Sequence, residues 1–213
     1  VTRSLKEAGI QSHLLVIEPG ESSKSIDVAG QLWADVLATG ADRTSMVVAV
    51  GGGVVGDLAG FIASSYARGI RLLQVPTTLL AQVDSSVGGK VGIDLPSAKN
   101  MVGAFWQPCA VICDTQTLSS LPDREFSAGL AEVVKYGVIL DEQFFVELEE
   151  NAGAIWNRDA ALLRRVVARC CELKAAVVGE DERETTGQRA VLNYGHTFCH
   201  AIESLTGYGQ FLH

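Results

Sequence analysis

The stretch SMVVAVGGGVVGDLAG, residues 45–60, decides the predicted fold. Its apolar first part predicts a short buried strand, and its apolar second part predicts a helix. Glycines join the two, and Gly51, Gly53 and Gly56 fit the spacing G-x-G-x-x-G. In such a turn the backbone can approach a phosphate closely, and the N-terminus of the helix favours negative charge. The stretch therefore indicates a nucleotide site, with a tight β–α turn that binds nothing as the alternative.

Strand and helix patterns alternate on both sides of this stretch. Apolar runs and helical spacing predict, in chain order, a helix ending at Gly9, a strand at 12–19, a helix at 25–40, and strands at 70–76 and 109–115. Such alternation favours an α/β domain with a parallel sheet. Beyond it the signals are helical only, at 122–140, 142–150, 158–182 and 187–206. We therefore predict a Rossmann-like α/β nucleotide-binding domain, residues 1–121, followed by an all-α domain, residues 122–213.

Composition restricts the possible partners. The 213 residues are 47% hydrophobic and carry a formal net charge of −8. An acidic chain does not neutralise the phosphates of a nucleic acid, so we expect no nucleic-acid partner. The five cysteines are odd in number and lack a paired CxxC spacing, which fits a reducing compartment better than a disulfide framework. We see no signal peptide and no apolar run that would span a bilayer, and we expect a cytoplasmic protein without a membrane partner.

The segment PTTLLAQVDSSVGGKVGIDLPSAKN, residues 76–100, does not resemble a core element. It is rich in Gly, Ser and Thr, and it carries Lys90, Lys99 and Asn100. Lysines beside flexible glycines can bind phosphate as point charges. A solvated loop with incidental lysines explains the segment equally well when the segment is taken alone.

The stretch GLAEVVKYGVIL, residues 129–140, carries Glu132 and Lys135 inside an otherwise apolar helix. Burying a carboxylate is costly unless the carboxylate is paired or bound to a metal. The apolar neighbours favour a buried functional pair over the alternative, which is an exposed Glu–Lys pair on the outer face of the helix.

The stretch NYGHTFCH, residues 193–200, places Asn193, His196 and His200 on one polar stripe of a predicted helix. Histidines at i and i+4 have a familiar spacing of metal ligands. The zincin pattern needs Glu directly after the first His, and Thr197 stands there instead. Two core histidines are the alternative, but the buried glutamate of the preceding motif and a third nearby histidine favour a metal site.

These motifs, in this order, resemble those of the 3-dehydroquinate synthase family, which belongs to the sugar-phosphate cyclases. The matching stretches are GGGVVGDLAGF, VPTTLLAQVDSSVGGK, AKNMVGAF, GLAEVVKYG, LKAAVVGEDERET and NYGHTFCHAIE. The resemblance extends from about Glu18 to His213. Because the family is larger at both ends, it implies a truncated chain, which we expect to bind metal weakly and to turn over negligibly on its own.

The resemblance implies a lyase of the shikimate pathway, which leads to the aromatic amino acids. Such an enzyme uses catalytic NAD and a divalent metal, Zn²⁺ or Co²⁺. It converts a seven-carbon keto-acid phosphate, DAHP, into 3-dehydroquinate with elimination of phosphate. Three alternatives stay open: another cyclase of the 2-deoxy-scyllo-inosose or valiolone type, a metal-dependent alcohol dehydrogenase of related fold, and an inactive fragment.

The resemblance also implies the residues of the site. The metal ligands would be Glu132, His196 and His213, whereas spacing alone favoured His196 and His200. The residues implied for NAD are Glu21, Lys24, Gly53, Val54, Val55, Gly56, Asp57, Thr77, Thr78, Lys90, Lys99, Thr117, Leu118, Ser119 and Ser120. Those implied around the substrate and nicotinamide are Asp84, Lys90, Lys99, Asn100, Lys135, Lys174, Arg189, Asn193 and His200. Arg68 would reach the substrate of a neighbouring subunit, which implies a homodimer.

Two positions depart from the family pattern. Ala98 replaces the glycine of the family's GKN before Lys99. The stretch ERETTGQR has one residue more than the usual form, which could shift Arg189.

Overall fold

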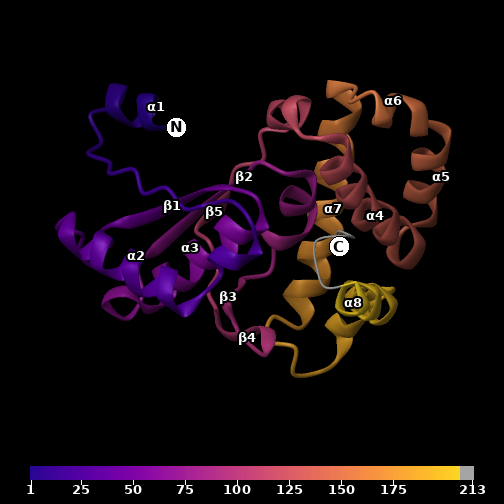
Figure 1. Ribbon diagram of the computed structural model, residues 1–213. Helices are drawn as coiled ribbons and strands as arrows, with labels where there is room; N and C mark the ends of the chain where they lie inside the picture. The colour runs from indigo at the N-terminus through magenta and orange to yellow at the C-terminus, as the bar shows by residue number, and fades with distance from the viewer. Residues whose placement is uncertain (207–213) are drawn as a thin grey trace.

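The computed structural model describes residues 1–206, without the side chains of residues 200, 203 and 204. Its first part is built on a parallel sheet of three strands in the order β1-β2-β5, with β1 at Met46–Gly51, β2 at Arg71–Pro76 and β5 at Ala110–Val111. Two further strands, β3 (Lys90–Leu95) and β4 (Ala98–Phe105), pair antiparallel in a hairpin. Figure 1 shows both sheets in the first half of the chain and helices in the second half.

Helix α3 (Gly53–Ser65) is the central packing element of the first part. One of its faces packs on the parallel sheet, where Ala63 meets Ala49 and Leu72. Its other face carries Leu58 and Ile62, which pack against β3 and against α2 (Ile26–Ala38). Burial on both faces explains why the sequence of α3 is apolar almost throughout. A short helix, α1 (Thr2–Glu7), precedes these elements.

The second part is helical. It contains α4 (Asp123–Leu140), α5 (Glu142–Glu150), α6 (Ala152–Trp156), α7 (Ala160–Glu180) and α8 (His196–Leu205), with short 3₁₀ helices η4 (Thr115–Ser120) and η5 (Gln188–Asn193). These helices share one apolar core, which includes Phe126, Val133 and Val166. Leu79 and Val83 from the first half of the chain are buried in the same core. The two parts are therefore joined by apolar packing as well as by the chain.

The structure confirms the α/β fold class with helices following, but it differs from several local predictions. Residues 12–19 do not form a strand; Leu14 is 71% and Val16 is 81% exposed. A strand needs a neighbour for its backbone groups, and no described strand pairs with this segment. The strand predicted at 109–115 is only two residues long. Helix α6 was not predicted, because its five residues are too few for a periodic signal.

The polar segment at 76–100 was also misjudged, because much of it is core. It forms a buried π-helical turn, η3 (Ala81–Ser85), and then the whole of β3. The helix predicted at 187–206 is divided: η5 ends at Asn193, Gly195 adopts a left-handed φ of 83°, and α8 begins at His196. Asn193 and His196 therefore do not lie on one helical stripe.

Candidate active site

The glycine-rich turn lies at the carboxyl edge of the parallel sheet, where α/β proteins bind their ligands. Strand β1 ends at Gly51, and the Thr77 N–H, just beyond the end of β2, donates to the Gly51 carbonyl at 2.9 Å. Thr117 in η4 follows the end of β5 at the same edge. The structure thus gathers at one edge the residues implied for NAD by three separate stretches.

The turn itself fits the phosphates of a dinucleotide. A Cβ added at Gly52 would lie 3.1 Å from Thr78 Cγ2, and one added at Gly53 would lie 3.2 Å from Ser85 Oγ. Helix α3 begins here, and its N-cap, Gly52, supplies no side-chain hydrogen bond to the first N–H groups. The first N–H groups of a helix lack partners within the helix and attract anions. A side chain at Gly52 or Gly53 would crowd Thr78 or Ser85 beside these N–H groups.

A charged cluster lies beside this turn. The Lys24 ammonium contacts Asp57 Oδ2 at 2.9 Å and donates to Asn100 Oδ1 at 2.5 Å. Glu21 lies 3.5 Å from Lys24 and 3.8 Å from Lys99. Burial alone would lower the pKa of Lys24, but Asp57, Glu21 and Asp94 outweigh burial and raise it. Lys24 is therefore a firmly charged, buried cation that ties α3 and β4 together.

A glutamate–histidine pair lies in the helical part. Glu132 of α4 is 6% exposed, and its Oε1 lies 3.5 Å from Nε2 of His196, the first residue of α8. Its Oε2 is in ion-pair contact with Lys135 but accepts no hydrogen bond from any described residue. A carboxylate oxygen and an imidazole nitrogen facing each other suit Zn²⁺ or Co²⁺.

The third implied ligand, His213, lies outside the described residues, as does the side chain of His200. Within residues 1–206, no group of three His, Cys, Asp or Glu side chains is placed to hold a metal ion. The structure therefore brings two of the three implied ligands together, and the donor chemistry of these two fits the metal.

Asp84 lies between helices α4 and α7 and contacts a side chain of each. The Lys174 ammonium donates to Asp84 Oδ1 at 2.6 Å and to the Asp84 carbonyl at 2.7 Å, and the Tyr136 hydroxyl donates to Oδ1 at 3.1 Å. Burial would raise the pKa of Asp84, but Lys174, Lys135 and Tyr136 lower it to about 2. Lys135 also donates to the Leu192 carbonyl at 2.8 Å, which connects α4 to η5. Lys135 and Lys174, two of the residues implied around the substrate, are thus held in place by a carboxylate and by backbone carbonyls.

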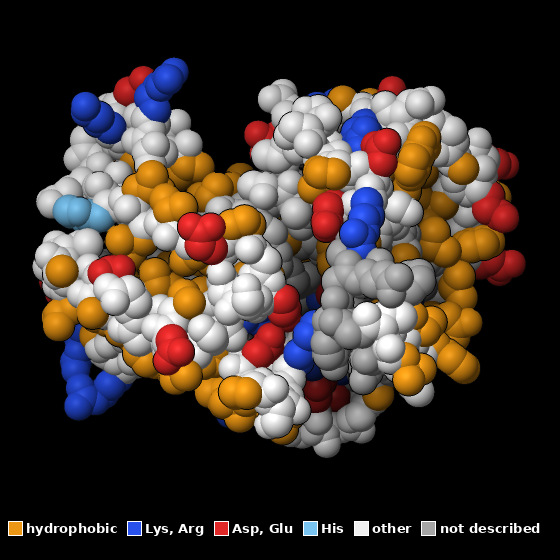
Figure 2. Space-filling model, viewed as in Figure 1, with side chains coloured by type: hydrophobic (Ala, Val, Ile, Leu, Met, Phe, Trp, Pro, Cys, Tyr) orange, Lys and Arg blue, Asp and Glu red, His pale blue; other side chains and the backbone are white. Residues whose placement is uncertain are grey.

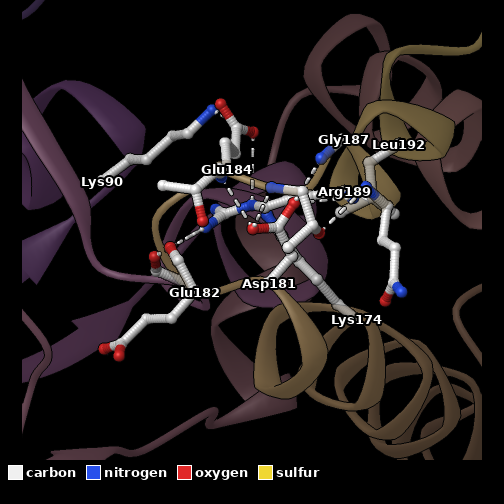
Figure 3. Close-up of polar contacts among 12 residues, drawn as sticks. Lys90, Lys174, Asp181, Glu182, Glu184, Gly187, Arg189 and Leu192 are labelled. Atoms are coloured by element: carbon white, nitrogen blue, oxygen red, sulfur yellow. Dashed lines mark hydrogen bonds and ion pairs between the residues drawn. The ribbon is translucent and has the colours of Figure 1, made fainter.

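Arg189 is held by the loop that follows α7 (Figure 3). Its guanidinium donates to the carbonyls of Gly88 at 3.2 Å and Glu182 at 3.0 Å, and its Nε lies 3.4 Å from Glu184. Glu184 also contacts Lys90 at 2.6 Å. The extra residue in this loop leaves Arg189 beside the Gly88–Lys90 stretch.

Asp181, which the sequence reasoning passed over, organises that loop. It is 3% exposed, and its two oxygens accept from the backbone N–H groups of Thr185, Thr186, Gly187 and Arg189 at 2.8, 3.2, 3.0 and 3.4 Å. Burial would raise the pKa of Asp181, but these hydrogen bonds lower it to about 2. An Asp followed at short range by a glycine turn was the available signal, because Asp side chains accept from backbone groups just ahead of them.

Two implied residues lie away from these clusters. Arg68 is exposed and precedes β2, at the edge of the sheet opposite to the glycine-rich turn. Asn193 is exposed at the end of η5. In the space-filling view, Lys, Arg, Asp and Glu side chains lie close together where the α/β part meets the helical part, and others are scattered over the visible surface (Figure 2).

This architecture is that of the sugar-phosphate cyclases, as two solved structures demonstrate. The 2-deoxy-scyllo-inosose synthase complexed with carbaglucose-6-phosphate, NAD⁺ and Co²⁺ is 36% identical, with a TM-score of 0.88 over 99% of this chain and 57% of that chain. The 2-epi-5-epi-valiolone synthase of Streptomyces hygroscopicus subsp. jinggangensis, with NAD⁺ and Zn²⁺ bound, is 26% identical, with a TM-score of 0.92 over 99% of this chain and 59% of that chain.

Within this class, the chain belongs to the 3-dehydroquinate synthase family. The N-terminal model of the family matches residues 14–128, and its C-terminal model matches residues 129–213. A curated relative named 3-dehydroquinate synthase, from Rhodopirellula baltica, is 58% identical over all 213 residues. The chain spans 57% of the length of that relative.

Proposed function

We propose that the protein acts as a 3-dehydroquinate synthase, which converts DAHP to 3-dehydroquinate and releases phosphate. The observation that carries this proposal is the contact between Glu132 and His196 inside a group of buried cations. Family membership and the relatives of that name support the same activity. NAD at the glycine-rich turn and Zn²⁺ or Co²⁺ at the Glu–His pair are the proposed cofactors, as in the two solved cyclases.

Each group of residues has a proposed role. The turn at Gly53–Asp57, with Glu21, Lys24 and the threonines at the sheet edge, holds the dinucleotide, which when bound accepts and returns a hydride while the metal polarises a substrate hydroxyl. Glu132, His196 and His213 hold the metal. Charge-assisted hydrogen bonds from lysine and arginine suit a substrate that bears both a phosphate and a carboxylate. The residues proposed for that task are Lys90, Lys99, Asn100, Lys135, Lys174, Arg189 and His200.

Most of these cations already have internal partners. Lys174 contacts Asp84, Lys90 contacts Glu184, and Lys135 contacts Glu132. Such contacts place each ammonium group before the substrate binds, which reduces the cost of ordering it later. The nucleotide-binding and metal-binding parts would divide near residue 121, so that the substrate is held between them.

A second candidate is another sugar-phosphate cyclase, favoured by the 36% identity to 2-deoxy-scyllo-inosose synthase. A six-carbon sugar phosphate lacks the carboxylate of DAHP, so the two candidates differ in the need for an additional cation. Phosphate release separates them. We expect release from DAHP in the presence of NAD and Zn²⁺, without accumulation of NADH.

The assay uses the protein as its source organism makes it, with the Rhodopirellula baltica relative as a positive control. Release from glucose 6-phosphate but not from DAHP would favour the second candidate. Steady accumulation of NADH would indicate a net dehydrogenase and would overturn both candidates.

Arg68 supports a further proposal, a homodimer in which this exposed side chain reaches the neighbouring site. Size-exclusion chromatography with light scattering tests it, and a monomer at micromolar concentration would contradict it. A cytoplasmic location is proposed with the shikimate-pathway role. None of the helices among residues 1–206 is long and apolar enough to cross a bilayer.

A further inference from the structure

Two cysteines that are far apart in the sequence meet at one backbone oxygen. Cys113 lies between β5 and η4, and Cys171 lies in α7. Their Sγ atoms lie 3.8 and 3.3 Å from the same acceptor, the carbonyl oxygen of Gln82 in η3. The two sulfurs therefore lie no farther apart than the sum of these two distances, and each thiol shifts the pKa of the other. Both cysteines are half-buried.

The surroundings give the two thiols different reactivities. The neighbouring Cys113 thiol lowers the pKa of Cys171, and the Lys174 ammonium, one helical turn away, lowers it further against the opposing effect of burial. The neighbouring Cys171 and burial raise the pKa of Cys113. Because the thiolate is the reactive form of cysteine, Cys171 is the nucleophile of the pair. Cys113 is then positioned as the resolving thiol.

Two other cysteines, Cys170 and Cys109, lie in different surroundings. Cys170, the neighbour of Cys171 in α7, is 0% exposed, and burial raises its pKa. Cys109 is exposed and precedes β5. They serve as internal comparisons for the reactivity of the pair.

We propose that Cys113 and Cys171 form a site of reversible oxidation, at which a hydroperoxide converts the two thiols into a disulfide. The Cys171 thiolate attacks one peroxide oxygen, the O–O bond breaks, and a sulfenic acid and, after protonation, water result. The Cys113 sulfur then attacks the sulfenic sulfur, the S–O bond breaks, and a second water leaves. In total, two thiols lose two electrons and two protons, and hydrogen peroxide is reduced to two waters.

The disulfide would change the surroundings of Asp84. A disulfide has no S–H group, so neither sulfur could donate to the Gln82 carbonyl after oxidation. Gln82 lies two residues before Asp84 in η3, and Asp84 holds Lys174 at 2.6 Å. The new bond would also tie the segment after β5 directly to α7. Oxidation at this pair would therefore act on the group of charges proposed to hold the substrate. Transient disulfides of this kind occur in reducing compartments.

Peptide mapping tests the proposal. The reduced protein is exposed to hydrogen peroxide, its remaining thiols are alkylated, and its peptides are identified by mass spectrometry. We expect a cross-linked peptide pair that contains Cys113 and Cys171, the loss of two alkylatable thiols per chain, and full reversal by dithiothreitol.

Variants define what the cross-link requires. Cys109→Ser should form the cross-link as the wild type does, whereas Cys171→Ser should form none and should leave Cys113 alkylatable. The proposal is overturned if Cys171 pairs with Cys170 or Cys199 instead. It is equally overturned if Cys113 and Cys171 remain alkylatable while Cys109 is oxidised, or if Cys171 proceeds to sulfinic acid without any cross-link.

Discussion

Asp181 and Glu132 are both buried carboxylates, yet their surroundings differ in a way that separates structure from chemistry. Asp181 is 3% exposed, and both of its oxygens accept backbone N–H groups from the loop just ahead of it. Glu132 is 6% exposed, and its Oε2 accepts no hydrogen bond from a described residue. Its contacts are instead the ammonium of Lys135 and the imidazole of His196.

The difference concerns what each group can still bind. A carboxylate whose oxygens already accept hydrogen bonds from backbone amides stabilises the local fold and has few electron pairs left for a ligand. Glu132 instead directs Oε1 at the imidazole of His196 and Oε2 at the ammonium of Lys135, so among the described residues no backbone amide binds its oxygens, and they retain electron pairs for a metal ion. We therefore interpret Asp181 as a positioning residue for Arg189 and Glu132 as a metal ligand.

Glu132→Gln should have the largest effect on the metal. The neutral amide keeps the shape of the side chain but loses the negative charge that a divalent cation requires. Because even the loss of a group behind a ligand weakens metal affinity about 10- to 100-fold, we expect at least about 100-fold weaker Zn²⁺ binding. Isothermal titration calorimetry measures it. Glu125→Gln, at an exposed position on the same helix, is the matched control and should bind as the wild type does.

Asp181→Asn should have the opposite effect: it should lower the stability of the fold and leave metal affinity unchanged. The amide N–H₂ group would face backbone N–H groups, so at least one buried donor would lose its acceptor. We expect a loss of roughly 3 kcal/mol in the free energy of unfolding, measured by urea denaturation. Arg189 would lose its fixed place, so substrate KM should rise while metal affinity is retained. Glu182→Gln, on an exposed neighbour, should leave both quantities unchanged; equal effects of the two substitutions would remove the special role of Asp181.

Asp84 is an intermediate case, because side chains rather than backbone amides hold it. Its pKa of about 2 in the folded protein lies below the ordinary value of about 3.9. The folded state therefore binds fewer protons, and the stabilisation is complete above pH ~4 and is lost as the pH falls toward 2. Asp84→Asn should remove about 2 kcal/mol of this pH-dependent stability. Denaturation at several acid pH values measures it, and an unchanged acid slope would contradict the buried ion pair.

Lys90→Ala should have the smallest effect on stability. The Lys90 side chain is 50% exposed, and such ion pairs contribute little, so we expect a change within about 0.5 kcal/mol. The substrate dissociation constant should nevertheless rise about 10-fold, because a charge-assisted hydrogen bond to an anion is lost. Lys6→Ala in α1 is the control and should leave binding unchanged. A Lys90→Ala protein that binds substrate normally would exclude Lys90 from the site.

Local patterns predicted the fold well where neighbours in sequence decide it. The strand and helix at 45–60 and the long helices α4 and α7 follow from apolar spacing in the sequence. Residues 12–19 have a strand-like sequence but pair with no described strand. The Gly- and Ser-rich segment at 76–100 looked solvated, yet Leu79 and Val83 are buried by helices more than 40 residues away. Composition alone does not reveal such distant partners.

Local sequence patterns also predicted only part of the candidate site. Glu132 was found because a carboxylate stands out in an apolar helix, and its contact with His196 agrees with the resemblance to the family. Asp181 was passed over, because an acidic residue after a helix is common and its importance depends on a loop that folds back on it. The link between Lys174 and Asp84 spans 90 residues and could not be inferred from spacing.

A parallel Co²⁺ titration of the wild type, Glu132→Gln and Asp181→Asn tests the central distinction most directly, because bound Co²⁺ reports its ligands in the visible spectrum. We predict the same spectrum and affinity for the wild type and Asp181→Asn, and no saturable spectrum for Glu132→Gln. Wild-type binding by Glu132→Gln, or an equal loss of binding in Asp181→Asn, would contradict the account.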